Sequence, residues 1–552
     1  MPQLKLFFIA SSFLFLAACS GGSGSNNDDS VLTGQFVDSA VSGIRYETDT
    51  RSGITDSEGR FTYLAGERVR FYIGELMLGE AQSAATVSVF DLVEGINPVV
   101  GGALEKAIWN WRRGPGFSTV INIAILLQTL DDDGNPDNGI AISSEVAALF
   151  NPGSIDFNQH WQEFPLDRGF RKVLHEAKAS ALLDAGRQIR KPWAAMAHLY
   201  ASLGIDSRLP ALTSERIERP SAPGSDIFNA TYEFDTAGRL IRQQSPRIGP
   251  VGPLPQMQIL TFAYDAEDNL VSNAYDFEGD GIADGRTEYS YDADGNLVRL
   301  EFYWDDNLLH SITTITYDMY GNETSRQYDY DADGTPDSFD TYTYDSNGNQ
   351  IRAEYDSDGD GSPDVFNSYT YDAEDNLIRQ EYDYGAEGIL DAIYSYTYDA
   401  EGNLIREEDD YDGDNNPEVI NSYTYDARGN LLREETDYDG DGSPDYRYSY
   451  AFDDQDNLTR EEYDSGADGI LDGIFSYTYD ADGNLIREEY EYNREIVDTY
   501  VHTYDADGIQ IRGERYYQGN DGTTPDEIYI PTYDANTSGW WSIFNRGALL
   551  FL

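Results

Sequence analysis

A Tyr-Asp pair that recurs at a fixed interval constrains the fold of this chain more than any other feature. Between residues 228 and 534 the pair returns at a spacing of 27 residues almost throughout, with Phe452 in place of the tyrosine in one copy. Many copies at one period predict a repeat architecture, in which each unit packs on its neighbours. The tyrosines of the pairs are Tyr264, Tyr291, Tyr317, Tyr344, Tyr371, Tyr398, Tyr425, Tyr479, Tyr504 and Tyr533.

One copy illustrates the expected unit. Residues 421–435 have the pattern of a β-strand, a glycine-containing turn and a returning strand. Counting outward from the turn, we expect Tyr425 to lie opposite Leu431 and Tyr423 to lie opposite Arg433. One face of the hairpin would then carry tyrosine, leucine and arginine together. The repeats should form an elongated or curled antiparallel sheet with loops along one edge.

An arginine recurs in the returning strand of most copies. In the expected register its guanidinium lies over a tyrosine ring, a contact of about 0.5–1 kcal/mol at an exposed site, and neighbouring glutamates pair with it. Because nearly every copy has these groups, we interpret the ladders as structural. The alternative is a binding row, since repeated tyrosine faces stack on sugars or peptides. The arginines are Arg299, Arg326, Arg352, Arg379, Arg406, Arg433, Arg460 and Arg487.

The remaining length of each unit lies in acidic loops between the hairpins. Three loops read Asp-x-Asp-x-Asp-Gly-x-x-Asp, one lacks the glycine and ends in glutamate, and one has glutamate as its second acid. Calcium takes six to eight oxygen ligands, which alternating carboxylates on a tight loop can supply. We therefore predict Ca²⁺ ligands at Asp276, Glu278, Asp280, Asp284, Asp329, Asp331, Asp333, Asp337, Asp356, Asp358, Asp360, Asp364, Asp410, Asp412, Asp414, Glu418, Asp437, Asp439, Asp441 and Asp445.

Aspartate and glycine are also good turn formers, and this alternative leaves the loops without metal. An ordinary turn needs one or two aspartates, whereas these loops carry four acids at fixed offsets. The loops that begin at Asp383 and Asp464 have glycine at the second ligand position and are degraded. The acidic loops resemble thrombospondin type 3 and dockerin calcium loops. They lack the bidentate glutamate of an EF-hand, which predicts weak affinity, on the order of 10⁻⁴–10⁻³ M.

The Tyr-Asp pair followed by x-x-Gly-Asn-Leu resembles the YD repeats of the RHS family over more than half of the chain. The resemblance implies continuous antiparallel sheets that curl into a shell. Two departures from the family pattern stand out: the period is longer, and no RHS core-cleavage motif or toxin domain follows Tyr533. The toxin-delivery role of some relatives is therefore not expected here.

The amino-terminal residues read as an export signal with a lipid attachment site. A short apolar run ends in Leu16-Ala17-Ala18-Cys19, and Cys19 is the single cysteine of the chain. The motif resembles the lipobox of bacterial lipoproteins, which implies cleavage before Cys19 and acylation of that residue. The following Ser20 implies an outer-membrane location. The alternative is an ordinary signal peptide with an incidental cysteine.

The segments between this signal and the repeats divide by pattern. Residues 1–18 are a signal peptide, 19–30 a flexible tether, 31–100 a small β domain, 101–212 a mixed and mainly helical region, 213–227 a linker, 228–534 the repeats and 535–552 a C-terminal cap. The stretch Thr55-Asp-x-x-Gly59-x-Phe61-x-Tyr63 resembles prealbumin-like or Cna-B-like modules. His160, His175 and His198 have no metal-type spacing, so we interpret them as surface or hydrogen-bonded core residues.

Charge narrows the possible functions. Lys and Arg total 37 and Asp and Glu total 100, a net charge of −63, which argues against nucleic acid or an anionic membrane surface as a partner of the side chains. Neither G-x-S-x-G nor H-E-x-x-H nor a phosphate-binding loop occurs, so we expect no enzyme.

Together these features predict a mainly β protein, an antiparallel β repeat array of the RHS type preceded by a small β-sandwich and a helical region. We expect a lipoprotein of the outer membrane, exposed at the cell surface, that binds Ca²⁺ and acts in adhesion or as an interaction scaffold for a glycan or protein partner. The alternatives are an RHS-like shell component of a toxin or competition system, or a carbohydrate-binding protein.

Overall fold

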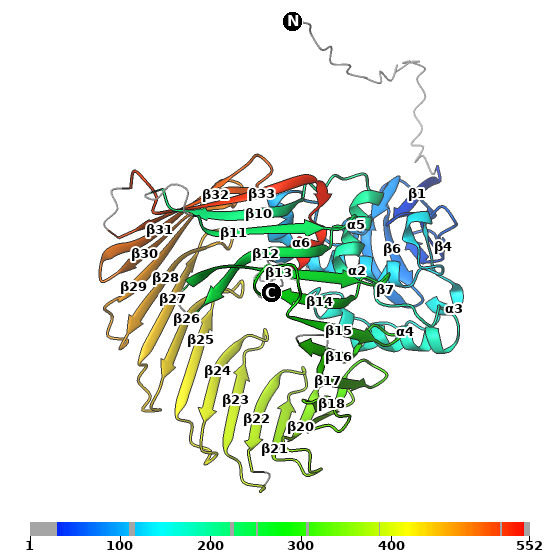
Figure 1. Ribbon diagram of the computed structural model, residues 1–552. Helices are drawn as coiled ribbons and strands as arrows, with labels where there is room; N and C mark the ends of the chain where they lie inside the picture. Colours follow the sequence, from blue (N-terminus) through cyan, green and yellow to red (C-terminus); the bar gives the residue numbers. More distant parts are fainter. Residues whose placement is uncertain are drawn as a thin grey trace, which may run out of the picture.

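The computed structural model describes residues 30–109, 116–220, 226–249, 252–304, 308–385, 387–518 and 522–545. Its first part, up to residue 209, holds small sheets and helices, and its second part is a large ring of strands (Figure 1). Cys19 and the expected signal and tether lie outside the described residues. No helix of the described chain is long and apolar enough to cross a membrane.

The second part is a closed barrel of 24 antiparallel strands in chain order. The strands are β10 (Pro210–Glu218), β11 (Asp226–Phe234), β12 (Leu240–Gly249), β13 (Gly252–Tyr264), β14 (Leu270–Asp276), β15 (Gly285–Tyr291), β16 (Leu297–Trp304), β17 (Leu308–Tyr317), β18 (Glu323–Asp329), β19 (Ser338–Tyr344), β20 (Gln350–Asp356), β21 (Val365–Tyr371), β22 (Leu377–Asp383), β23 (Ala392–Tyr398), β24 (Leu404–Asp410), β25 (Val419–Tyr425), β26 (Leu431–Asp437), β27 (Tyr446–Phe452), β28 (Leu458–Ser465), β29 (Gly473–Tyr479), β30 (Leu485–Tyr492), β31 (Glu495–Tyr504), β32 (Gln510–Tyr517) and β33 (Glu527–Ser538).

Strand β10 closes the ring by pairing with β11 on one side and β33 on the other, with Leu212 opposite Tyr533 and Ile217 opposite Tyr529. This corrects the expected linker over residues 213–227, whose two ends are strand. The segment carries proline, serine and charge, which are typical of a linker, but its hydrogen-bond partner β33 lies about 300 residues away. Closure leaves the sheet without an unpaired edge.

The repeat unit is the expected hairpin, with one change in register. Tyr425 lies opposite Leu431, as predicted. A β-bulge between Thr424 and Tyr425 then shifts the pairing by one residue, so that Tyr423 faces Glu434 and Arg433 faces Thr424. The expected pairing of Tyr423 with Arg433 is therefore wrong. Since a shift of one residue moves a side chain to the other face of a sheet, arginine and tyrosine lie on opposite faces of this hairpin.

The tyrosine face of the sheet lines the inside of the barrel. The short helix α6 (Trp540–Phe544) contacts Tyr264 of β13 through Trp541, with ring centroids 6.4 Å apart, and its other side borders Tyr504 of β31. Those strands are separated by β10–β12, β32 and β33, roughly 30 Å of sheet at ~4.8 Å per strand. A helix ~7.5 Å long can reach both only from the concave side.

The first part contains a three-stranded sheet in the order β5-β1-β8, a four-stranded sheet in the order β4-β3-β6-β7, and helices. This agrees with a small β domain followed by a helical region. The elements are β1 (Leu32–Val37), β2 (Val41–Ser42), β3 (Arg45–Thr48), β4 (Ser52–Ile54), β5 (Arg60–Tyr63), β6 (Arg68–Ile73), β7 (Leu76–Gln82), β8 (Thr86–Ser88), η1 (Phe90–Leu92), α1 (Gly102–Trp109), α2 (Gly116–Thr129), η3 (Pro136–Asn138), β9 (Ile140–Ala141), α3 (Ser144–Ala147), η4 (Phe164–Leu166), α4 (Arg168–Ala179) and α5 (Pro192–Ser202).

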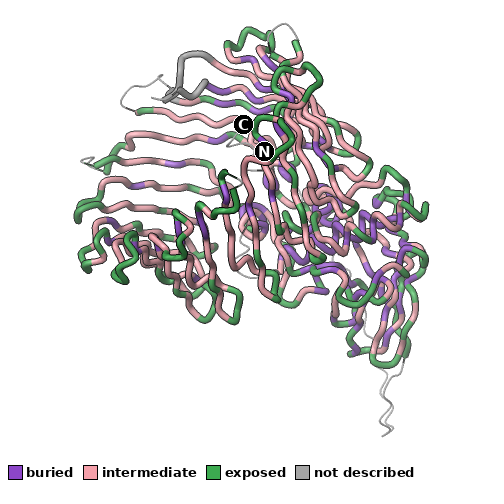
Figure 2. Tube along the Cα trace, turned by 90° about the horizontal axis from the view of Figure 1, so that it is seen from below, coloured by how far each residue is buried: buried purple, intermediate pink, exposed green. Residues whose placement is uncertain are grey.

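Buried residues concentrate in this first part, whereas the barrel wall is mostly of intermediate exposure (Figure 2). Helix α2 is buried along nearly its whole length and forms the centre of the main hydrophobic core. The barrel wall is one layer of sheet, and among the described residues the first part and α6 are what cover parts of its two faces.

Basic side chains of the first part bind the turns that contain the Tyr-Asp pairs. Lys178 donates to Asp294 at 2.6 Å, Lys106 donates to Asn484 at 2.7 Å, and Arg208 forms an ion pair with Asp507 at 2.7 Å. Further contacts join Arg168, Arg171 and Lys191 to the turns at Asp345, Asn296 and Asn269. The first part therefore sits on the turn edge of the barrel, and the acidic loops lie on the opposite edge.

Candidate functional site

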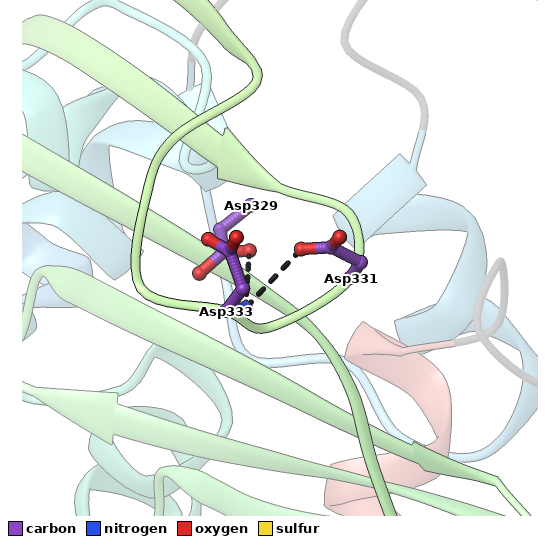
Figure 3. Close-up of side chains that lie close together, drawn as sticks. All are labelled: Asp329, Asp331 and Asp333. Atoms are coloured by element: carbon purple, nitrogen blue, oxygen red, sulfur yellow. Dashed lines mark hydrogen bonds between the residues drawn. The ribbon is translucent and has the colours of Figure 1, made fainter.

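Four acidic loops on the edge opposite the Tyr-Asp turns bring three carboxylates together. In each group one oxygen of every residue lies within 4.8 Å of the others. Figure 3 shows the three carboxylates of the first group converging within one loop. The groups are Asp329, Asp331 and Asp333; Asp356, Asp358 and Asp360; Asp410, Asp412 and Glu418; and Asp437, Asp439 and Asp445.

The first aspartate of each loop is buried and organises the loop backbone. The Oδ2 atom of Asp437 accepts a hydrogen bond from the N–H of Gly442 at 2.7 Å, while Asp445 accepts one from the N–H of Tyr438 at 2.8 Å. Burial acts to raise the pKa of Asp437, and the backbone N–H groups around it outweigh that effect, so its pKa lies below the ordinary value. Asp437 is thus held ionised.

The two degraded loops, which begin at Asp383 and Asp464, show which of these hydrogen bonds form without the full set of acids. Asp383 accepts a hydrogen bond from the N–H of Gly388 at 2.7 Å, and Asp464 accepts one from Gly469 at 3.0 Å. The same bond therefore forms without an acid at the second ligand position. Turn formation accounts for the first aspartate of every loop. The further carboxylates also accept loop N–H groups, as Asp358 does from Asp360 at 3.2 Å and Asp360 from Ser362 at 2.8 Å, but only four loops bring three of them together.

Asp356 is the strongest candidate ligand. Its side chain is only 6% exposed, its Oδ2 atom accepts from the N–H of Gly361 at 2.7 Å, and its Oδ1 atom is buried without a hydrogen-bond partner among the described residues. A buried carboxylate oxygen with no donor costs free energy, and a cation held with Asp358 and Asp360 would offset that cost.

The other predicted ligands accept hydrogen bonds from the loop backbone or lie outside the groups of three carboxylates. Within the described residues, no group of three forms around Asp276, Glu278, Asp280 and Asp284. Asp276 instead accepts from the N–H of Gly281 at 2.7 Å, and Asp284 accepts from Phe277 at 2.6 Å. Four residues of the remaining loops lie outside the groups, namely Asp337, Asp364, Asp414 and Asp441.

The inner face of the barrel carries a second feature that sequence reasoning missed, a row of paired tyrosines and glutamates. Opposite residues in successive hairpins are Tyr396 and Glu407, Tyr423 and Glu434, Tyr450 and Glu461, and Tyr477 and Glu488. The bulge beside each Tyr-Asp turn places these glutamates inside. The only sequence signal is the Arg-Glu-Glu triplet, whose two glutamates must lie on opposite faces of a strand.

The row of inner glutamates is electrostatically unbalanced. Glu407, Glu434 and Glu461 form no ion pair with any described residue. The fourth glutamate, Glu488, lies 2.8 Å from Nε2 of His502. Tyr423 donates to Glu407 at 3.2 Å, which leaves the charge in place. Burial raises the pKa of Glu461, and the neighbouring charge of Glu434 raises it further.

The outer face is balanced by contrast. Arginines there pair with the glutamate two residues later, as in Arg379 with Glu381 at 2.8 Å and Arg460 with Glu462 at 2.6 Å. The predicted pairing of arginine with glutamate is thus confirmed in these hairpins. Exposed pairs of this kind contribute about 0–1 kcal/mol each.

His198 joins three segments of the first part of the chain. Its Nε2 atom lies 3.0 Å from Ser39 Oγ and its Nδ1 atom lies 3.1 Å from Asp137 Oδ1. The arrangement of serine, histidine and aspartate resembles the catalytic triad of a hydrolase. However, the Asp137 side chain is 85% exposed, whereas the aspartate of such a triad is buried, which strengthens its electrostatic interaction with the histidine. His198 is the hydrogen-bonded core histidine that the sequence predicts.

No family model and no curated protein matches the chain. Among solved structures it is similar to the TcdB2-TccC3 toxin, with 14% identity and a TM-score of 0.28 over 56% of this chain, and to the Photorhabdus luminescens Tc holotoxin pore, with 13% identity and a TM-score of 0.22 over 56%. The chain spans less than a fifth of each of those chains, 18% and 19%. A porin-like protein from Bacteroides uniformis is 12% identical, with a TM-score of 0.21 over 46% of this chain and 95% of that one. TM-scores of this size carry no argument about function.

Proposed function

We propose that this protein is a lipid-anchored, calcium-binding surface scaffold that holds a positively charged partner, a basic polypeptide segment, against the inner face of its barrel. The observation that carries this proposal is that Glu407, Glu434 and Glu461 lie inside the barrel beside tyrosine rings and have no basic partner among the described residues. Lysine and arginine of a partner would pair with the carboxylates and stack on the rings.

The calcium part of the proposal rests on the four carboxylate groups, above all on Asp356. Cations at these loops would reduce repulsion along an edge of a chain with a net charge of −63. In this account calcium stiffens the loop edge, and the inner face selects the partner.

A binding experiment with matched variants tests the inner face. The full chain is titrated with a lysine- and arginine-rich peptide and with a neutral glycine-serine peptide. The double variant Glu434→Gln with Glu461→Gln should weaken binding of the basic peptide by about tenfold or more. Glu435→Gln with Glu462→Gln removes two outer-face charges next to them and should leave binding within about twofold. Equal loss in both variants would mean that general charge, and not the inner face, attracts the peptide.

The anchor is tested by mass spectrometry of the amino end of protein purified from membranes. The lipobox ending in Cys19 supports an acylated cysteine as the first residue. Cys19→Ser should release the protein from the membrane fraction. An unmodified amino end would remove the lipid anchor from the proposal and leave the inner-face binding intact.

The closed ring favours a second candidate, an RHS-like shell component that encloses a segment instead of binding it reversibly. Co-purification distinguishes the two. A shell retains its contents through dilution and high salt, whereas a charge-based binding site releases a basic peptide as salt rises.

A further inference from the structure

A separate acidic loop lies in the first part of the chain, far in sequence from the barrel. It follows α2 and begins at Asp131, whose side chain is 1% exposed. The Oδ1 atom of Asp131 accepts a hydrogen bond from the N–H of Ala141 at 2.9 Å. Its Oδ2 atom is buried and has no hydrogen-bond partner among the described residues.

The carboxylate of Asp133 lies beside that of Asp131. Burial raises the pKa of Asp131, and the contact with Asp133 raises it further. Neither acid forms an ion pair with a described residue. Arg187 lies near, but its N–H groups donate to the backbone carbonyls of Thr129, at 2.9 Å, and of Asp131 and Asp132.

We propose that Asp131 and Asp133 bind a divalent cation of the hard, oxygen-preferring class, such as Ca²⁺. A cation between the two carboxylates would satisfy the orphaned Asp131 oxygen and separate two negative charges. Asn135 follows at the same spacing, so that oxygen-bearing side chains alternate as they do in the barrel loops. Gly134, with φ +75°, provides the tight turn.

The position of this cation gives it a structural role. The loop leads into β9, which pairs with β2 through Ile140 and Val41. Asp137 of the same loop contacts His198 of α5 at 3.1 Å. A cation that fixes the loop would therefore hold the small β domain to the helices, independently of the barrel edge and of any partner.

Metal counting on the full chain tests the site. The full chain is dialysed to equilibrium against calcium, and the calcium held by the protein is counted by inductively coupled plasma mass spectrometry as the excess over the outer buffer. Asp133→Asn should lose one equivalent of calcium relative to the native chain, while Asp132→Asn, an equally exposed neighbour, should lose none. Asp133 is exposed, but its carboxylate accepts hydrogen bonds from the N–H of Asn135 and from the side-chain amide of Asn138, each at 2.9 Å, so circular dichroism is recorded to check that Asp133→Asn keeps the native fold.

A third variant distinguishes calcium bound at the barrel loops from calcium bound at this site. Asp358→Asn lowers the calcium count only if the barrel loops bind calcium. Its outcome does not affect the comparison of Asp133→Asn with Asp132→Asn. Thermal unfolding supplies a second readout, because calcium should raise the midpoint of the native chain more than that of Asp133→Asn. An unchanged calcium count in both Asp131→Asn and Asp133→Asn would overturn the proposal, whatever the barrel loops do.

Discussion

The hydroxyl of Tyr425 donates a hydrogen bond to the backbone carbonyl of Leu404, 2.9 Å away and 21 residues earlier in the chain. The same bond joins Tyr398 to Leu377 and Tyr479 to Leu458. From Tyr264 to Tyr504, the tyrosine of each Tyr-Asp pair thus ties its own hairpin to the one before it. The following aspartate closes the turn, since Asp426 accepts from the N–H of Asn430 at 2.9 Å and from its side-chain amide at 3.0 Å.

Removing one of these hydroxyls should weaken the barrel. Tyr425→Phe leaves the Leu404 carbonyl without its donor and should lower the free energy of unfolding by about 1 kcal/mol. Urea unfolding followed by circular dichroism measures the change. Tyr438→Phe is the matched control, because that ring is 56% exposed and its loss should be within about 0.5 kcal/mol. Equal effects at the two positions would contradict a specific role for the Tyr425 hydroxyl.

The turn aspartates predict sensitivity to acid. Hydrogen bonds from Asn430 hold the pKa of Asp426 below its ordinary value, and those from Asn403 do the same for Asp399. A carboxyl whose pKa is lower in the folded chain stabilises the fold above its unfolded pKa, and this stability is lost as pH falls through the folded value. The stability that these turn aspartates contribute should therefore be complete above the unfolded pKa, 3.8, and the unfolding midpoint should fall as pH drops below it. A midpoint that stays constant into strong acid would argue against this.

Calcium should stabilise the barrel only through the four loops in which three carboxylates lie together. Asp358→Asn removes one carboxylate from the group around Asp356 and should reduce the calcium-induced rise in unfolding temperature. Asp468→Asn alters the degraded loop that begins at Asp464 and should not reduce it. Differential scanning calorimetry with calcium and with chelator gives both values. An equal reduction in the two variants would point to diffuse charge screening.

The contact between the first part and the barrel edge should depend on Lys178. Its side chain is 9% exposed and donates to Asp294 at 2.6 Å and to the Ala293 carbonyl at 2.7 Å. Lys178→Met leaves these acceptors unpaired, so amide hydrogen exchange in the turn around residue 294 should become faster. Lys172→Met, at an exposed position of the same helix, serves as control. Unaltered exchange in Lys178→Met would show that other contacts hold this turn.

The local parts of the fold could be predicted from the sequence, and the long-range parts could not. The turn from Asp426 to Asn430 depends on residues that are neighbours in the sequence, and it recurs with the 27-residue period. The hairpin and the pairing of Tyr425 with Leu431 could therefore be predicted, and both are confirmed. The bulge after Thr424 has no sequence signal of its own, and it decides which glutamates point inward. The pairing of β10 with β33 and the contact of Lys178 with Asp294 join distant segments, which no local pattern encodes.

The candidate site divides in the same way. Alternating aspartates predict the loops, and four of five loops gather three acids. The sequence cannot separate Asp356, with its unpartnered oxygen, from Asp276, whose oxygens are taken by backbone N–H groups. That difference depends on the loop backbone and not on residue type.

Site-specific labelling distinguishes a partner bound at the inner face of the barrel from one bound elsewhere. In a Cys19→Ser background the chain has no other cysteine, so Thr436→Cys on the inner face and Thr424→Cys on the outer face each supply a single thiol. The rate of maleimide labelling is measured with and without the lysine- and arginine-rich peptide. A peptide bound at the inner face should slow labelling at residue 436 and leave the rate at residue 424 unchanged. Protection at residue 424 alone, or at neither residue, would rule out binding at the inner face.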